Sequence, residues 1–85
     1  MSIKVFIVDD HALVRAGFRL ILGREVDIEV VGEAESGEDA LPQIRKLKPD
    51  VVLCDLHLTG ISGLEVTERV VRGDYGSRVI VVSVL

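Results

Sequence analysis

The sequence is poor in aromatic residues and in cysteine. Aromatic residues make up 4% of the 85 residues, tryptophan is absent and cysteine occurs once. The 48% hydrophobic content therefore predicts a core built from Val, Ile, Leu and Ala. A single cysteine excludes a disulfide framework within the chain, and Cys54, which lies inside an apolar run, is typical of a buried free thiol in a reducing compartment.

The sequence also lacks clustered positive charge and a long apolar run. The net charge is −4 and the ten Lys and Arg residues are scattered. This argues against nucleic-acid binding by the segment, because phosphate neutralisation needs clustered cations. No apolar run approaches the roughly 18 residues of a membrane span, and the N-terminus lacks the features of a signal peptide. We expect a single cytoplasmic domain over residues 1–85 that has no membrane contact.

Four apolar segments alternate with three segments of helical periodicity. Strands are predicted over 3–10, 28–34, 49–55 and 78–85, and helices over 11–24, 36–48 and 63–72. The strands are nearly continuous apolar runs, which is typical of parallel strands covered on both faces. The alternation predicts the α/β class, with a parallel sheet and right-handed crossovers.

Two of the predicted helices have features that bear on their packing and their ends. In the first, one apolar face is shared by Leu13, Ala16, Gly17, Leu20 and Ile21, and Val14 and Phe18 lie beside it. In the second, Ser36 and Asp39 stand in capping-box order. A start at Ser36 places Pro42 inside the helix at a cost of about 3 kcal/mol, whereas a start at Asp39 places it in the first turn. The sequence leaves both starts open.

Carboxylates stand where two of the predicted strands end. Asp9 and Asp10 close the first strand, and Asp55 closes the third. The ends of neighbouring parallel strands lie ~5 Å apart, and open α/β sheets bind ligands beyond that edge. If these strands are neighbours, the three acids converge, and a hard divalent cation such as Mg²⁺ relieves their repulsion. The alternative for Asp10 is an N-cap of the following helix.

Three further polar residues are predicted near the same edge. The hydroxyl of Ser83, near the end of the fourth strand, either binds an anion held on Asp55 or fills a strand position. His11 and His57 lie beside the expected pocket but lack metal-ligand spacing to each other or to Cys54. The spacing favours solvent-facing histidines, with an influence of His57 on a nearby water as the alternative.

These segments together resemble a known family. The stretches VFIVDDHALVRAGF, DVVLCD, GLEV and VIVVS are similar to the receiver domain of two-component response regulators. The DDH…LVR.G opening resembles the NarL/FixJ branch and regulators of the GacA/UvrY type. The resemblance covers essentially the whole chain. It implies a flavodoxin-like and CheY-like doubly wound parallel sheet with strand order 2-1-3-4.

The resemblance also implies a function. Asp55 is the expected phosphoacceptor, served by a histidine kinase or a small phosphodonor. Asp10, Asp55 and the backbone carbonyl of His57 are the expected Mg²⁺ ligands, and Asp9 binds through water or completes the acidic pocket. Ser83 matches the hydroxyl that carries the switch. Such a protein is not an enzyme beyond self-phosphorylation and autodephosphorylation.

Several departures from the family pattern qualify this expectation. Leu58 and Thr59 stand where the family often has Met-Pro, and Val84 stands where it often has Ala. A complete receiver continues with a helix, a fifth strand that ends in an essential lysine, and a last helix, and in this branch a DNA-binding output domain follows. The sequence lacks these elements, and Lys4 lies at the wrong end of its strand. The resemblance therefore implies a C-terminally truncated receiver.

Truncation predicts self-association and leaves rival functions open. An exposed, apolar fourth strand is a template for pairing, so we expect a homodimer or oligomer through that edge. One alternative is a folded, phosphorylation-incompetent fragment that acts only through self-association. Another is a Mg²⁺-dependent phosphohydrolase, although those enzymes typically carry Asp-x-Asp after the first strand. A nucleotide-binding module is disfavoured, because no Gly-rich loop follows that strand.

Overall fold

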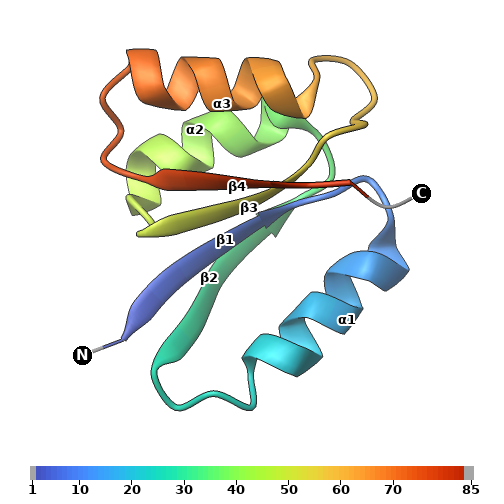
Figure 1. The fold of residues 1–85 in the computed structure, drawn as a ribbon, viewed down its shortest axis with the longest axis vertical. Helices are drawn as coiled ribbons and strands as arrows, with labels where there is room; N and C mark the ends of the chain where they lie inside the picture. Colours follow the sequence, from blue (N-terminus) through green and yellow to red (C-terminus); the bar gives the residue numbers. More distant parts are fainter. Residues whose placement is uncertain (1, 84–85) are drawn as a thin grey trace.

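The computed structural model describes residues 2–83. The elements follow the predicted order: β1 (Ile3–Val8), α1 (Ala12–Leu22), β2 (Ile28–Ala34), α2 (Gly37–Leu47), β3 (Val51–Asp55), α3 (Gly63–Arg72) and β4 (Arg78–Val82) (Figure 1). All four strands pair in parallel, in the order β2-β1-β3-β4. The predicted α/β class and strand order 2-1-3-4 are confirmed. Between residues 2 and 83, no helix has the length and apolar character needed to cross a membrane.

Two predicted strand ends differ from the structure. β1 ends at Val8, so Asp9 and Asp10 lie in the turn that follows. β4 ends at Val82, and residues 84–85, including Val84, lie outside the described residues. The N-cap of α1 is His11, which makes no side-chain capping bond. The interpretation of Asp10 as an N-cap is therefore wrong, because the helix begins one residue later.

Helix α2 begins at the earlier of its two predicted starts. The hydroxyl of Ser36 accepts a hydrogen bond from the Asp39 N–H at 3.1 Å, and Pro42 lies inside the helix. Proline removes one intrahelical bond there. The cap and the burial of Ala40 and Ile44, both fully buried, outweigh that loss.

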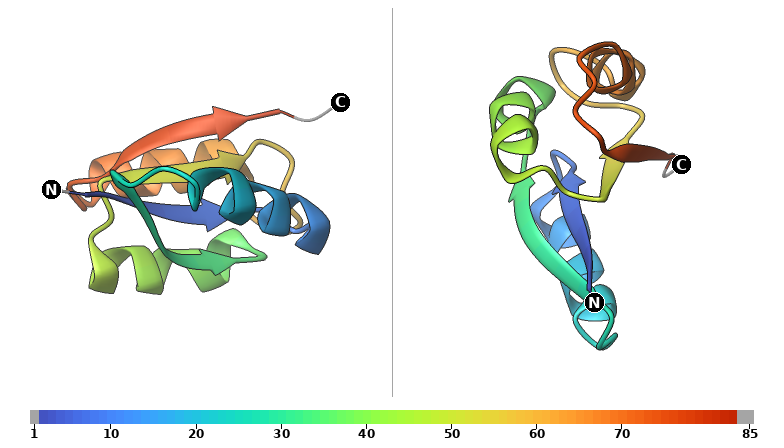
Figure 2. Two further views of the ribbon diagram at one scale, coloured as in Figure 1. Left: turned by 90° about the horizontal axis from the view of Figure 1, so that it is seen from below. Right: turned by 90° about the vertical axis from the view of Figure 1, so that its left-hand side faces the viewer.

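Most of the core lies on one face of the sheet. Figure 2 shows α2 and α3 together on that face and α1 alone on the other. The core unites strand residues Phe6, Val8, Val52 and Cys54 with helix residues Ala40, Leu41, Ile44, Val66 and Val70. Burial raises the pKa of the Cys54 thiol to about 11, so the thiol is protonated and unreactive at neutral pH. The predicted buried free cysteine is confirmed.

The opposite face of the sheet is covered more lightly. Of the residues of α1, all of which the structure describes, none is fully buried. Leu13 is 85% exposed, and Leu20 and Ile21 are exposed as well. The half-buried residues of α1 include Ala16 and Gly17 of the apolar face that the sequence singled out, and the full set is Val14, Arg15, Ala16, Gly17, Phe18 and Leu22. Charge supplements this packing: Arg15 and Arg19 of α1 both form ion pairs with Glu33 of β2.

Candidate metal centre

The pairing of β1 with β3 brings acidic residues to the same edge of the sheet. The register aligns Val8 with Cys54, so Asp9 and Asp55 each follow an aligned pair. Asp9 is 4% exposed and Asp55 is 5% exposed, and these are the buried charged residues of the described chain. The prediction that the first and third strands are neighbours in the sheet is therefore confirmed.

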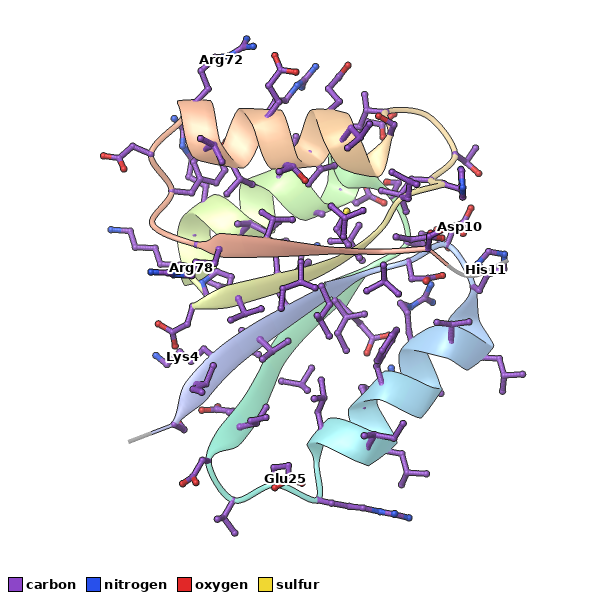
Figure 3. All side chains as sticks on the ribbon, in the orientation of Figure 1. Lys4, Asp10, His11, Glu25, Arg72 and Arg78 are labelled. Atoms are coloured by element: carbon purple, nitrogen blue, oxygen red, sulfur yellow. The ribbon has the colours of Figure 1, made fainter. Side chains whose placement is uncertain are left out.

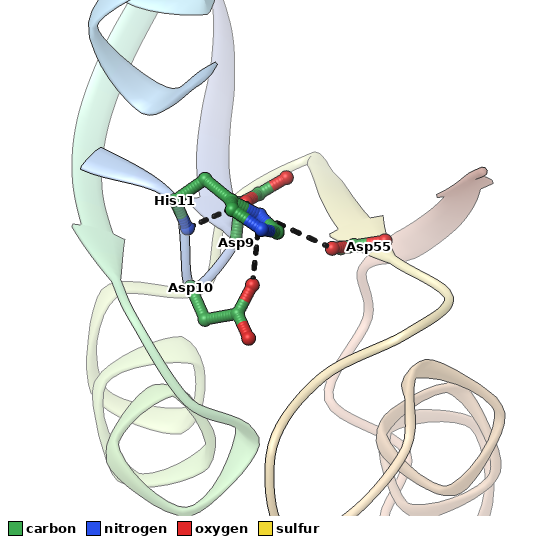
Figure 4. Close-up of side chains that lie close together, drawn as sticks. All are labelled: Asp9, Asp10, His11 and Asp55. Carbon is green, nitrogen blue, oxygen red and sulfur yellow. Dashed lines mark hydrogen bonds and ion pairs between the residues drawn. The ribbon is translucent and has the colours of Figure 1, made fainter. Parts of the chain in front are cut away.

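Four side chains form one compact cluster at this edge. Asp9, Asp10, His11 and Asp55 each place a potential ligand atom within 4.8 Å of the others (Figure 4). The Nδ1 atom of His11 lies 2.9 Å from Asp9 Oδ1, 2.9 Å from Asp10 Oδ1 and 4.0 Å from Asp55 Oδ2. The cluster thus combines carboxylate oxygens with one imidazole nitrogen.

The sequence did not indicate that His11 belongs to this cluster. Its side chain is 66% exposed, as expected for a solvent-facing residue, yet Nδ1 points toward the acids. The turn explains the orientation, because the His11 N–H donates to Asp9 Oδ1 at 2.8 Å and brings the ring over that carboxylate. The hydrogen bond to Asp9, with the charge of Asp10, raises the pKa of His11. The one sequence feature that could have indicated this contact is the position of His11 directly after Asp9-Asp10.

Asp10 carries the clearest sign of an incomplete site. Its Oδ2 accepts a hydrogen bond from the Thr59 hydroxyl at 3.0 Å. Its Oδ1 is shielded from solvent and makes no hydrogen bond within the described part of the chain. Buried polar atoms are normally satisfied, and a hard cation with oxygen ligands would satisfy this one. The residues present therefore fit Mg²⁺.

The loop after β3 contributes a residue that sequence reasoning did not identify. Thr59, through its bond to Asp10, ties this loop to the turn after β1. Leu58 is partly buried against the core. Leu58 and Thr59, which stand where the family often has Met-Pro, are thus held by one apolar contact and one hydrogen bond, respectively. Nothing in the spacing of residues 55–59 indicated the contact with Asp10.

Asp55 is held by its neighbours on three sides. The His57 N–H donates to Asp55 Oδ1 at 3.1 Å, and the Leu56 N–H donates to the Val82 carbonyl of β4 at 2.9 Å. At Gly63, the first residue of α3, any Cβ would overlap the Asp55 carbonyl oxygen. Glycine there permits the close approach of α3 to the end of β3. The His57 side chain is exposed and stands apart from the four-residue cluster.

Two other sequence predictions concern more distant residues. Ser83 lies one residue beyond β4 and is exposed. Its switch role, like the ligand role of the His57 carbonyl, stays a prediction. Lys4 lies near the start of β1, at the end of the sheet opposite Asp10 and His11 (Figure 3). It is far from the acidic cluster, as its sequence position indicated.

Comparison with known families identifies the class of protein. Residues 5–85 match the model of the response regulator receiver domain. The chain belongs to this family. This receiver chain is 49% identical over 82 residues to the response regulator GacA of Pseudomonas aeruginosa and 48% identical to UvrY of Escherichia coli K12. In each comparison the match covers 96% of the chain and 38% of the relative.

A solved structure agrees with this assignment. The signal receiver domain of NarL from Mycobacterium tuberculosis superposes with a TM-score of 0.93 at 35% identity. The match covers 96% of the chain and 66% of that receiver domain. The chain therefore spans well under half the length of its curated relatives and about two thirds of this one solved domain. The resemblance to the NarL/FixJ branch and the GacA/UvrY type is confirmed.

Proposed function

We propose that the chain is a Mg²⁺-dependent phosphoacceptor of a two-component response regulator, phosphorylated on Asp55. The observation that supports this most directly is the convergence of Asp9, Asp10 and Asp55 from two neighbouring strands in a chain of the receiver family. The solvent-shielded Asp10 Oδ1, which makes no hydrogen bond in the described chain, supports the metal part of the proposal.

In this proposal the acidic residues hold a metal ion, and one of them also accepts the phosphoryl group. Asp10, Asp55 and the backbone carbonyl of His57 would hold Mg²⁺, and Asp9 would bind it through water or complete the pocket. The ion, when bound, neutralises charge on the oxygens of the transferred phosphoryl group.

Asp55 is the nucleophile of the transfer. The His57 N–H occupies Oδ1, and Oδ2 faces the cluster. A carboxylate oxygen of Asp55 attacks phosphorus in line. An acyl phosphate forms, the phosphorus–nitrogen bond of a phosphohistidine donor breaks, and its electron pair leaves with the imidazole, which takes a proton from water.

Phosphorylation would switch the chain through charge. It replaces one negative charge on Asp55 by about two, enough to reorder a nearby polar segment. We propose that the Ser83 hydroxyl is the group that turns toward the phosphoryl oxygens. A related structure, the REC domain of RcsB from Salmonella enterica, was solved in the presence of phosphomimetic BeF₃⁻ and is 28% identical with a TM-score of 0.90.

The proposed partners follow from the same chemistry. A histidine kinase or a small phosphodonor supplies the phosphoryl group in the cytoplasm, where the Cys54 thiol stays reduced. The net charge of −4 argues against DNA contacts by this segment. DNA binding, as in the RcsB structure bound to promoter rprA, would belong to an output domain and not to this segment.

Intact-mass spectrometry tests the phosphoacceptor. The protein is incubated with acetyl phosphate, with and without Mg²⁺, beside the variants Asp55→Asn and Asp50→Asn. Asp50 is an exposed aspartate at the opposite edge of the sheet and serves as the matched control. We expect a Mg²⁺-dependent phosphoryl adduct in the wild type and in Asp50→Asn, and none in Asp55→Asn. Sustained turnover of a phosphomonoester would indicate a phosphohydrolase, and absence of any adduct a phosphorylation-incompetent fragment.

We also propose that β4 mediates self-association of the 85-residue chain. Within residues 2–83 this strand is an edge of the sheet, and Ile80 is 51% exposed on it. An edge that is apolar and uncharged from Val79 to Val82 favours pairing with a second copy. Light scattering after size-exclusion chromatography should show a dimer or larger species that Ile80→Lys converts to a monomer. A wild-type monomer at high concentration would contradict this.

A further inference from the structure

We propose that the His11 imidazole is a side-chain ligand of the metal site and shifts its preference toward ions that accept nitrogen, such as Co²⁺ and Zn²⁺, relative to Mg²⁺. This inference rests on the proposed function, because it concerns the same cation site. It adds a residue that determines which cation the site selects.

The spacing of the ligand atoms fits a single ion. Around an octahedral ion with bonds of about 2.1 Å, adjacent ligands lie about 3.0 Å apart and opposite ligands about 4.2 Å apart. The His11 Nδ1 atom lies 2.9 Å from Asp9 Oδ1 and from Asp10 Oδ1. It lies 4.0 Å from Asp55 Oδ2. The separation from Asp10 Oδ1 matches adjacent ligand positions and that from Asp55 Oδ2 approaches an opposite pair, while Asp9 Oδ1 completes the pocket beside them.

Hydrogen bonding alone does not satisfy this arrangement. An imidazole nitrogen carries at most one proton and donates it to one acceptor. His11 Nδ1 is hydrogen-bonded to Asp9 Oδ1, and Asp10 Oδ1, at the same distance from Nδ1, makes no hydrogen bond in the described chain. A cation between Nδ1 and the carboxylates would satisfy every one of these atoms.

Hydrogen bonds of the turn hold the ring in place. The His11 N–H is bound to Asp9 Oδ1, and the Arg15 guanidinium donates to the Asp9 carbonyl oxygen at 2.6 Å. Arg15 thereby links α1 to the turn that carries His11. The ring is 66% exposed, so an ion reaches it from solvent without opening the core.

The chemistry of the donor set predicts the direction of the preference. Mg²⁺ strongly favours oxygen ligands, whereas imidazole suits later first-row ions and zinc. Three carboxylates alone would form an oxygen site. Addition of one imidazole nitrogen raises the affinity for Co²⁺ and leaves that for Mg²⁺ nearly unchanged.

Calorimetric titration of the wild type with Co²⁺ and with Mg²⁺, beside His11→Ala, tests the preference. His11 makes no capping bond, so its replacement removes no helix cap. Leu13→Ala, at an exposed position of α1 two residues after His11, is the matched control. We expect His11→Ala to weaken Co²⁺ binding by about tenfold or more and to change Mg²⁺ binding by less than about twofold. Leu13→Ala should change neither.

A spectroscopic signal assigns the ligand directly. Proton NMR of the Co²⁺ protein should show a paramagnetically shifted imidazole N–H signal that disappears in His11→Ala, although His57 is still present. Persistence of that signal, or an unchanged Co²⁺ to Mg²⁺ affinity ratio, would overturn the proposal.

The outcomes separate this inference from the proposed function. Mg²⁺-dependent phosphorylation of Asp55 with an unchanged affinity ratio in His11→Ala would overturn the role of His11 alone. Co²⁺ binding through His11 without any phosphoryl adduct would support His11 and contradict the phosphoacceptor. A wild type that binds neither ion would overturn both.

Discussion

The two faces of the sheet are stabilised in different ways. On one face, α2 and α3 bury a continuous apolar cluster that includes Phe6 and Ile44, both fully buried. On the other, α1 has no fully buried residue and is joined to β2 by ion pairs of Arg15 and Arg19 with Glu33. The first face supplies most of the stability. The second positions the turn after β1, because Arg15 also holds the Asp9 carbonyl.

The two faces should differ most in the free energy of unfolding that is lost when an apolar side chain is truncated to alanine. Phe6→Ala should lower the free energy of unfolding by about 3–5 kcal/mol, because it opens a cavity in the core. Leu20→Ala on exposed α1 should change it by less than about 0.5 kcal/mol. Urea unfolding monitored by circular dichroism measures both. Similar losses in the two variants would remove the distinction between the faces.

Replacement of glycine by alanine should have opposite effects on the two faces. Gly63→Ala places a Cβ against the Asp55 carbonyl, so we expect a loss of about 1–3 kcal/mol and slower phosphorylation of Asp55. Gly17→Ala in α1 meets no atom within 4 Å and should stabilise by about 0.5–1 kcal/mol. Thermal unfolding and the adduct assay measure these effects. If Gly63→Ala stabilised the protein and Gly17→Ala destabilised it, the packing described here would be contradicted.

The charge contacts of α1 should show a smaller, pH-dependent contribution. The hydrogen bond from Arg19, reinforced by Arg15, lowers the pKa of Glu33. A lowered folded-state pKa stabilises the protein above the ordinary carboxyl pKa, and this stability is lost as pH falls through the folded-state value. Glu33→Gln should therefore cost about 0.5–1 kcal/mol at pH 7 and nothing in strong acid.

Urea titrations of the wild type and Glu33→Gln at several pH values measure this difference. A cost that stays constant from neutral to acid pH would show that Glu33 acts through packing and not through its charge.

The sequence predicted the elements whose pattern is local and repeated. Two apolar runs closed by Asp9-Asp10 and Asp55 predicted which acids meet, because parallel strand ends share one edge. The start of α2 stayed open, because the cost of Pro42 competes with a cap and with burial, and tertiary packing decides between them. The predicted end of β4 at residue 85 lies outside the described residues, and Ser83 already lies beyond the strand.

The place of His11 in the acidic cluster was missed for a different reason. The prediction from sequence relied on histidines spaced along the chain like known metal ligands. His11 instead meets the acids because the turn that begins at Asp9 folds it back onto them. The sequence also did not indicate which side of α1 is exposed. Leu13 and Leu20 share a helical face, but periodicity does not state which side of a helix meets a sheet.

Paramagnetic broadening by Mn²⁺ tests the central claim, that the ends of β1 and β3 together bind one divalent cation. Addition of less than one equivalent of Mn²⁺ to isotope-labelled protein should erase the amide signals of residues 9–11 and 55–57. The signals of Ile3, Val51 and Arg78, at the opposite edge of the sheet, should persist. Broadening centred on another part of the chain, or unchanged signals at residues 9–11 and 55–57, would contradict the account.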